Sequence, residues 1–361
     1  MFSNALTANA SDKIRVTFLN PTGPKNDFWS TVTSFMKAAA EDLGMEFTVH
    51  YVHQENQHYK SFVALQKDID ANKAPDYLVM PFIRGGSSLR TLVTAEKNNI
   101  KTLIFNTDIP EKDRRSTGYP RGKFKKWIGH IYPDDKKAGF DLGNELIKAS
   151  RQKVKTTAKG KVEVIGISGD HLSSAAILRN DGLKLAVKEN GEMLQQLVST
   201  NWDRENAKKK AEILMRRFPN ATVFWSASDH MSLGIIEAIK NSGKIPGKHI
   251  MSGGVDWMPD ALDAIRDGHM TASIGGHFME AGWIMVMLYD YHHGKDFAKS
   301  EGLNIQSRMD IINQSNVEDY LKYFKDRKWE KIDFKQLSKV LNPKVKKYDF
   351  SLKTILNQLK Q

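Results

Sequence analysis

The strongest constraint on the fold of this chain is an alternation of strands and helices that recurs along most of its 361 residues. One unit shows the pattern clearly: an apolar strand is predicted at 223–225, and a helix with apolar Leu233 and Ile236 and a second strand at 250–255 follow. Strands separated by helices of about 10–15 residues predict parallel sheets, because each helix returns the chain to the same edge.

These units form two sets of similar size and order, one within residues 14–131 and one within 135–291. A basic stretch at 114–126 separates them and is predicted as a surface loop. We therefore predict an α/β protein with two doubly wound lobes, each built on a parallel sheet. Facing strand ends would create a ligand cleft between the lobes.

The charge of the chain is concentrated at its C-terminal end. Of a formal net charge of +12, an excess of eight positive charges lies from Lys322 onward, where 12 lysines and arginines face 4 acidic residues. Trp329, Phe334 and Tyr348 are interspersed there. This favours a solvated basic surface whose aromatic residues anchor it to the body over an arm that binds nucleic acid.

Several chemistries are excluded or disfavoured. The chain has no cysteine, so disulfides, thiolate metal sites and a cysteine nucleophile are excluded. Gly85-Gly86-Ser87-Ser88 lacks the lysine of a phosphate-binding loop. The histidine spacings do not resemble a metal site, and no serine stands in a nucleophile elbow. We expect no enzyme activity, no metal and no cofactor.

Aromatic and planar polar side chains gather just after the predicted strands. Aromatic faces stack on the C–H faces of a sugar ring, while carboxylate, amide and guanidinium groups form paired hydrogen bonds with neighbouring hydroxyls. The pattern favours a sugar-like ligand. The residues concerned include Asn26, Phe28, Trp29, Arg84, Asn106, Asp170, Arg179, Trp202, Ser228 and Asp256.

In these stretches the chain resembles the type I periplasmic binding proteins, a superfamily that includes ribose- and galactose-binding proteins, autoinducer receptors and the effector domains of repressors. The resemblance runs from about Ile14 to about Phe324 and is carried by Asn26–Trp29, Ser173–Gly182, Asn201–Arg204 and Ser228–Gly234. It implies two hinged lobes. The N-terminal lobe comprises 11–132 and 276–304, the C-terminal lobe comprises 133–275 and 305–327, and residues 328–361 form a basic C-terminal extension.

The resemblance also implies residue roles: Phe28 and Trp29 as stacking platforms, Arg179 as a two-pronged donor, Trp202 as the opposite wall and Asp256 as a hydroxyl acceptor. The chain departs from the pentose binders, which have an Asp-Arg pair at Asn106-Thr107 and a glutamine near Gly276-His277. Ribose itself is therefore not the expected ligand, and Arg84 or His277 would supply the missing contact. The predicted ligand-binding residues are Asn26, Phe28, Trp29, Arg84, Asn106, Arg179, Trp202, Ser228, Asp256 and His277.

Structural interpretations compete with these roles. Arg179 could pair with Asp181 on the surface, Phe28 and Trp29 could be core residues that open a helix, and Asp229 is expected to cap a helix N-terminus. Pro259 is expected to open the next helix after Asp256.

The predicted function is a periplasmic receptor that closes over a small sugar-like ligand and delivers it to the permease of an ABC transporter. A receptor for a sugar or furanosyl signal that acts through a membrane sensor kinase is the alternative. A repressor core is disfavoured, because the first strand begins by Ile14 and leaves no room for a DNA-binding motif. We expect a monomer that binds no nucleic acid. Ala8-Asn9-Ala10 would suit the end of a secretory signal, although small residues are common near termini.

Overall fold

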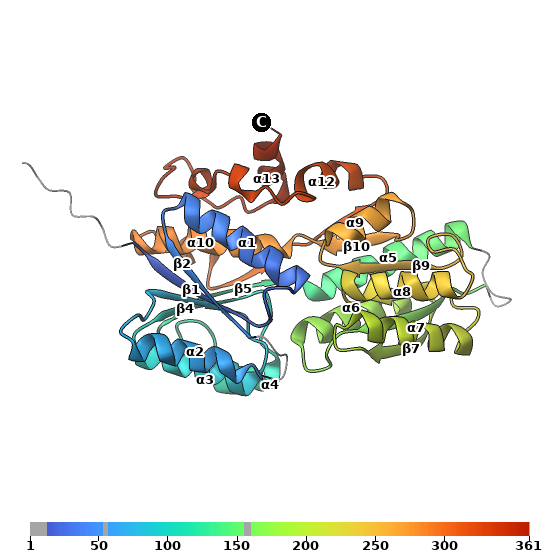
Figure 1. Ribbon diagram of the computed structural model, residues 1–361, viewed down its shortest axis with the longest axis horizontal. Helices are drawn as coiled ribbons and strands as arrows, with labels where there is room; N and C mark the ends of the chain where they lie inside the picture. Colours follow the sequence, from blue (N-terminus) through green and yellow to red (C-terminus); the bar gives the residue numbers. More distant parts are fainter. Residues whose placement is uncertain (1–12, 53–56, 155–159, 361) are drawn as a thin grey trace, which may run out of the picture.

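The computed structural model describes residues 13–52, 57–154 and 160–360. Ala8-Asn9-Ala10, the first residues of the predicted N-terminal lobe and the final residue of the chain lie outside the described residues. Two lobes lie side by side, and the C-terminal segment runs along one side of both (Figure 1). No helix within the described ranges is long and apolar enough to cross a membrane.

The first lobe is built on a six-stranded sheet in the order β11-β5-β4-β3-β1-β2, in which all neighbours are parallel. Helices α1 and α10 pack together on one face, and α2 and α3 pack together on the other (Figure 1). Its elements are β1 (Arg15–Asn20), α1 (Asp27–Asp42), β2 (Glu46–Tyr51), α2 (Tyr59–Asp70), β3 (Tyr77–Met80), α3 (Gly85–Lys97), β4 (Lys101–Phe105), α4 (Glu111–Thr117), β5 (Trp127–Pro133), η2 (His277–Met279), α10 (Glu280–His292), α11 (Ala298–Glu301) and β11 (Asn304–Ser307).

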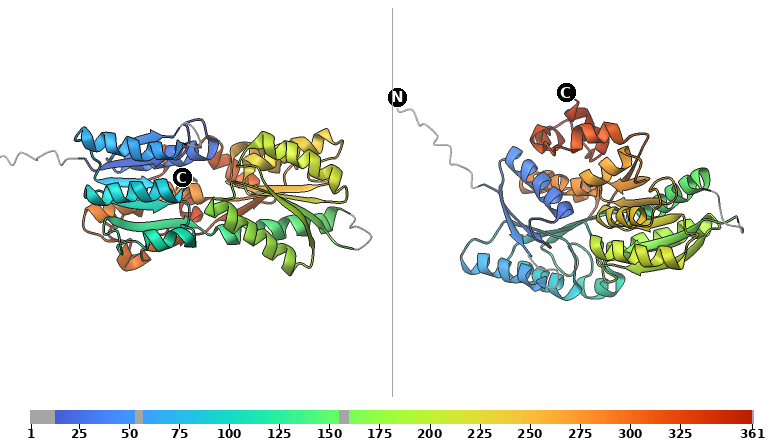
Figure 2. Two further views of the ribbon diagram at one scale, coloured as in Figure 1. Left: turned by 90° about the horizontal axis from the view of Figure 1, so that it is seen from below. Right: turned by 45° about the vertical axis from the view of Figure 1, so that its right-hand side comes forward.

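The second lobe repeats the design with the order β12-β10-β9-β8-β6-β7. Helix α5 packs against α6, and α7 packs against α8 on the opposite face of the sheet (Figure 2). Its elements are α5 (Asp135–Lys153), β6 (Glu163–Ser168), α6 (Ser174–Glu189), β7 (Met193–Ser199), α7 (Arg204–Arg217), β8 (Val223–Ser226), α8 (Asp229–Asn241), β9 (Met251–Val255), α9 (Pro259–Arg266), β10 (Ala272–Gly275), β12 (Asp310–Asn313) and α12 (Val317–Phe324).

The central strands are buried along nearly their whole length, as in β8 and β9, where every residue is buried. Such continuous burial is typical of parallel strands covered by helices on both faces. The predicted pair of doubly wound lobes is confirmed, with one departure: β12 runs antiparallel to β10.

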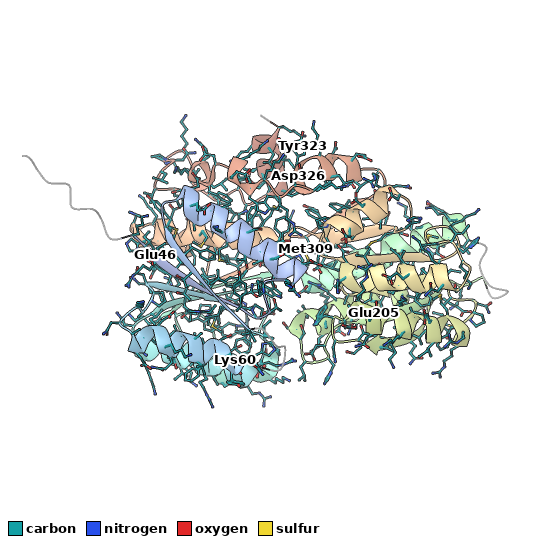
Figure 3. All side chains as sticks on the ribbon, viewed as in Figure 1. Glu46, Lys60, Glu205, Met309, Tyr323 and Asp326 are labelled. Atoms are coloured by element: carbon teal, nitrogen blue, oxygen red, sulfur yellow. The ribbon has the colours of Figure 1, made fainter. Side chains whose placement is uncertain are left out.

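The chain passes from one sheet to the other three times: after β5, after β10, and between β11 and β12. Strand β11 pairs with β5 in the first sheet, so the third passage follows Ser307 and not residue 304 as predicted. Met309 is labelled in Figure 3 where the ribbon passes from one lobe to the other. These passages bring the carboxyl ends of both sheets toward one junction.

The stretch at 114–126 is not simply the predicted loop, because α4 extends to Thr117. Arg114 is only 9% exposed, and its Nη2 donates to Oδ1 of Asp108 at 2.7 Å. The guanidinium also lies over the ring of Tyr119, at 4.8 Å from its centroid. A basic residue that the sequence placed on the surface is therefore buried by an ion pair and an aromatic contact.

The C-terminal extension consists of η3 (Trp329–Lys331), η4 (Phe334–Leu337), α13 (Leu352–Leu359) and their connections. Trp329 and Phe334 are buried beside Phe35 of α1, with ring centroids 5.2 Å and 5.4 Å from that ring. The expected aromatic anchoring of this basic segment onto the body is therefore present in the structure.

Candidate functional site

Arg179 of α6 is the centre of a buried charged cluster in the second lobe. Its side chain is 5% exposed, and its Nε donates to Oδ1 of Asp135 at 2.7 Å. Its Nη1 donates to the carbonyl oxygen of Ala227 at 2.8 Å and lies 3.8 Å from Oδ1 of Asp256. The Trp202 ring centroid lies 5.9 Å from Cζ of Arg179. The guanidinium is thus surrounded by residues from α5 and from three connections between a strand and the following helix.

Two glycines allow the cluster to form. A Cβ on Gly139 of α5 would lie 2.0 Å from the carbonyl oxygen of Arg179, and one on Gly182 of α6 would lie 2.1 Å from that of Lys136. Any side chain at these positions would push the helices apart. Their close backbone contact places Asp135, the first residue of α5, against Arg179.

His277 connects this cluster to the first lobe. It begins η2, directly after the second passage between the lobes, and is 1% exposed. Its Nε2 lies 3.5 Å from Oδ1 of Asp256, while its ring stacks on Phe28 of α1 at a centroid distance of 4.8 Å. Burial and the positive charge of Arg179 lower the pKa of His277 to about 3, so the imidazole is neutral at physiological pH.

The buried polar atoms at this junction that have no protein partner among the described residues include Oδ2 of Asp135, Nδ2 of Asn106 and Nδ1 of His277. Leaving such a group unpaired costs about 1–3 kcal/mol, and most buried polar groups are paired. The three atoms come from the start of α5, the end of β4 and the start of η2. They offer an acceptor, a donor and a group that can act as either.

The backbone at the strand ends is also unusual. Asn106 and Trp202 both have φ of 65°, and Asp256 has φ of 135°. Non-glycine residues rarely adopt positive φ, which costs on the order of 1–3 kcal/mol and concentrates at functional sites. These three predicted ligand residues share that feature, which no sequence pattern indicates.

Burial raises the pKa of three carboxyl groups in and beside the cluster. The pKa of Asp256 rises to about 7, opposed by the charge of Arg179. Burial and the nearby Asp256 raise the pKa of Asp229 to about 8. For Asp135, burial also raises the pKa, and the ion pair with Arg179 opposes it. Within the described ranges, no three histidine, aspartate or glutamate residues are grouped as metal ligands.

The structure brings Phe28, Asn106, Arg179, Trp202, Asp256 and His277 to the junction described above. Trp29 lies beside Phe28, with centroids 5.3 Å apart, and also packs edge-on against Phe105. The half-buried rings of Phe28 and Trp29 pack on the core, as the structural interpretation expected, and their role as stacking platforms stays a prediction.

Arg84 lies in a different part of the junction. It ends the connection after β3, and its Nη2 donates to Oδ2 of Asp170, which follows β6 in the other lobe. This ion pair joins the two lobes directly. The pKa of Asp170 is lowered, because hydrogen bonds from the backbone of Leu172 and from Arg84, together with the charge of Arg84, outweigh the effect of burial.

Two predicted residues act as helix caps. Asn26 is exposed and its Oδ1 accepts from the backbone of Trp29 at 3.0 Å, which caps α1. Ser228 is buried and caps α8 by accepting from the backbone of Met231 at 3.4 Å. Their contact with a ligand stays a prediction.

The expectation that Asp229 is the cap of α8 was wrong, because Ser228 holds that position. Asp229 is fully buried instead. Its Oδ2 accepts from the backbone of Met258 at 2.9 Å, and both carboxyl oxygens lie 2.8 Å from Oγ of Ser273. It thereby ties α8 to the turn that carries Asp256. Pro259 opens α9 as expected.

The alternative pairing of Arg179 with Asp181 was also wrong. Asp181 pairs with Lys184 on the exposed face of α6 at 3.1 Å, while Arg179 points to the buried face.

Asp135 and Glu280 were not among the predicted site residues. Glu280 is fully buried at the start of α10, where its Oε1 accepts from Oγ of Ser307 and its Oε2 has no partner among the described residues. Burial raises its pKa to about 8. Both residues begin helices that follow a passage of the chain between the lobes. An acidic residue at such a helix start is a sequence signal for the site, but the predicted residues were chosen at strand ends.

Comparison with known proteins supplies the family. A model described as periplasmic binding protein domain matches residues 16–296. The galactofuranose-binding protein YtfQ of Escherichia coli is 26% identical over 263 residues, which cover 70% of this chain and 74% of that protein.

Solved structures agree with this match. A periplasmic sugar-binding protein from Pseudomonas fluorescens has a TM-score of 0.83 and 29% identity, covering 96% of this chain and all of that one. A galactofuranose-binding protein aligns with a TM-score of 0.72 at 20% identity over 86% of this chain and 98% of its own, a likeness that concerns the fold alone. The predicted resemblance is confirmed: the chain belongs to the periplasmic binding protein family.

Proposed function

We propose that this protein is a periplasmic receptor that binds a small sugar-like ligand between its two lobes. The observation that carries the proposal is the set of three buried, unpaired polar atoms on Asn106, Asp135 and His277, beside the rings of Phe28 and Trp202. A polyhydroxylated ring both donates and accepts hydrogen bonds, so it can satisfy all three atoms. The names of the similar proteins, which bind galactofuranose, ribose and allose, support the same ligand class.

The aromatic rings would cover the apolar faces of the sugar, while Arg179 and Asp256 would hold its hydroxyls. Arg179 is fixed before the ligand arrives, because Asp135 and Ala227 already hold two of its nitrogens. Such prior positioning reduces the entropy that binding would otherwise cost. The site therefore suits tight binding of a small and highly hydrated molecule.

The two lobes would open and close about the three passages of the chain. The ion pair between Arg84 and Asp170 belongs to a state in which the lobes touch. We propose that the ligand favours this state, because it bridges groups from both lobes. The closed receptor would then deliver the sugar to the permease of an ABC transporter, in line with the name of the similar ribose import binding protein of Salmonella typhimurium.

Calorimetric titration of the purified protein tests the proposal. The panel comprises D-galactose, D-ribose, D-allose, L-arabinose, their methyl glycosides and simple disaccharides, with mannitol as an acyclic control. We expect at least one cyclic sugar to bind at one site with a Kd of roughly 10 μM or below. Failure of every sugar to release or absorb heat, at two temperatures to exclude a zero enthalpy, would reject sugar binding.

Transport is tested separately in the native host. Deletion of the gene should abolish high-affinity uptake of the labelled sugar identified by calorimetry, and the wild-type gene should restore it. Normal uptake in the deletion strain would reject delivery to a permease while leaving sugar binding intact.

A further inference from the structure

A cavity lies between the lobes, beside the Arg84–Asp170 ion pair. Its volume is about 170 Å³. The first lobe contributes residues from the start of α3 and from α4, and the second lobe contributes the connection into α6. The polar side chains in its wall are Arg84, Lys112, Asp113 and Ser174.

Two polar groups in this wall are buried and unpaired. Ser174 is 7% exposed, and its Oγ has no partner among the described residues. Nη1 of Arg84 is likewise buried without a partner, although Nη2 of the same guanidinium holds Asp170. Buried hydroxyl and guanidinium groups are rarely left in this state. The cavity therefore contains hydrogen-bonding capacity that the protein itself does not use.

The chemistry of the wall indicates what would use it. Arg84 and Lys112 are donors, Asp113 is an acceptor and Ser174 can be either, while Phe82 and Leu172 add apolar surface. An anionic group would meet the carboxylate of Asp113, and an apolar group would leave the polar atoms unpaired. A sugar ring, with hydroxyls around apolar C–H faces, matches this mixture.

The cavity is also adjacent to the main cluster. Trp202 of that cluster lies against Gly169, where a Cβ would come within 2.1 Å of the ring, and the next residue, Asp170, pairs with Arg84 in the cavity wall. A cavity of ~150 Å³ is large enough to hold benzene, so this one has room for a single six-membered ring. One elongated ligand could thus occupy both places.

We propose that this cavity is a second subsite that binds a second sugar ring, so that the ligand is a disaccharide or a comparable glycoside. The inference rests on the proposed function, since the first ring occupies the site around Arg179. The second ring satisfies Ser174 and Arg84, and its contacts reach residues of both lobes.

The test compares monosaccharides with disaccharides in calorimetric titrations. The probes are D-galactose and D-glucose, their methyl glycosides, and the disaccharides lactose, melibiose, cellobiose and maltose. We expect one disaccharide to bind at least roughly tenfold more tightly than the methyl glycoside of its terminal sugar. Disaccharides that bind no more tightly than the monosaccharides would overturn the second subsite and leave the proposed function standing. If neither class binds, both the second subsite and the proposed function fail.

Variants at the start of α6 locate the effect. Ser174→Leu should fill the cavity and weaken the disaccharide roughly tenfold or more, with the methyl glycoside changed by less than about twofold. Ser174→Ala, which keeps the cavity and removes the hydroxyl, should weaken the disaccharide less. Ser173→Ala is the matched control, because Ser173 is the neighbouring N-cap and forms no side-chain capping bond. An equal loss of affinity for the disaccharide and for the methyl glycoside in Ser174→Leu would contradict the proposal. If Ser174→Leu fails to fold, the milder Ser174→Ala provides the same comparison.

Discussion

At the scale of single residues, the site depends on how one guanidinium is held. The resemblance pointed to Arg179, Trp202 and Asp256, and the structure places all three together. It could not point to Asp135, which lies 44 residues before Arg179 and meets it only because α5 and α6 touch. A side chain at a strand end can be predicted from the sequence, whereas its buried partner depends on helix packing.

The first prediction concerns Arg179. Arg179→Ala should lower the affinity for the sugar roughly 100-fold or more, because it removes charged donors and leaves Asp135 buried without its partner. The free energy of unfolding should fall by about 3–5 kcal/mol, as for other broken buried ion pairs. Calorimetry and denaturant unfolding give the two numbers.

Arg216→Ala is the matched control, because Arg216 is an exposed arginine in α7 of the same lobe. It should leave both quantities unchanged. Wild-type affinity in Arg179→Ala would show that Arg179 has no part in binding.

The second prediction concerns pH. Because the pKa of Asp229 is raised to about 8 in the folded protein, this carboxyl stays protonated where the unfolded chain is ionised. Its contribution to stability is complete below its ordinary pKa and is lost as the pH rises through about 8. Asp229→Asn removes this titration. The wild-type Tm minus the Asp229→Asn Tm should therefore fall by at least about 3 °C between pH 5 and pH 8.5.

Thermal unfolding monitored by circular dichroism measures this difference. The comparison between variants cancels the opposite effect of His130 and His277, whose pKa values are lowered to about 4 and about 3. A difference that grows with pH would mean that Asp229 is ionised in the folded state.

At the scale of elements, the contact between α5 and α6 sets the geometry of the cluster. Gly139→Ala should separate these helices, since its Cβ would meet the backbone oxygen of Arg179 at 2.0 Å. We expect a loss of about 1–3 kcal/mol in stability together with weaker sugar binding. Chemical denaturation and calorimetry measure the two effects.

Gly86→Ala is the control for this prediction, because Gly86 lies in helix α3 and a Cβ there meets no atom within 4 Å. The free energy of unfolding of Gly86→Ala should differ from that of the wild type by less than about 1 kcal/mol. If Gly139→Ala were equally harmless, close packing of α5 on α6 could not be what positions Asp135.

Helices with a strong apolar periodicity could be predicted from the sequence, whereas the short edge strands β11 and β12 could not. Helices such as α1 and α7 carry clear apolar faces along their length. Strands β11 (NIQS) and β12 (DIIN) have only four residues each and lack a continuous apolar run. β11 lies at the edge of the first sheet and β12 at the edge of the second, because the chain passes between the lobes after β11. A local sequence pattern does not predict where that passage occurs.

At the scale of the whole molecule, the C-terminal segment ties the lobes together. Helix α12 packs on α9 of the second lobe, with Tyr320 5.1 Å from Trp257 between ring centroids. The extension then crosses to the first lobe, where it packs on α1 and α10. The C-terminal segment as a whole, from α12 to α13, therefore lies over both lobes (Figures 1 and 2). Tyr323 and Asp326 mark this segment in Figure 3. The sequence predicted its charge and anchors, while its path over both lobes emerged only in the structure.

Removal of residues 328–361 should strongly destabilise the protein. It uncovers the face of α1 that Trp329 and Phe334 bury. It also removes four donors to the fully buried Asp290: Oγ of Ser338 at 2.5 Å, the backbone of Lys339 at 2.7 Å, the backbone of Val340 at 3.2 Å and the hydroxyl of Tyr348 at 2.8 Å. We expect the Tm to fall by roughly 10 °C or more. Differential scanning calorimetry gives the value.

A charge-only variant separates packing from electrostatics. Lys344, Lys346 and Lys347 are exposed, and their joint replacement by serine removes three positive charges without touching the buried contacts. Its Tm should stay within about 2 °C of the wild type. An unchanged Tm in the truncated protein would show that the extension does not stabilise the lobes.

A crystal structure of the protein with its tightest-binding sugar tests the proposed site directly. We predict electron density for the sugar between the lobes, beside Trp202 and Phe28. Its hydroxyls should lie within roughly 3.2 Å of Oδ2 of Asp135, Nδ2 of Asn106 and Nδ1 of His277, a normal hydrogen-bond distance. A sugar bound elsewhere, with these three atoms still unpaired, would contradict the account.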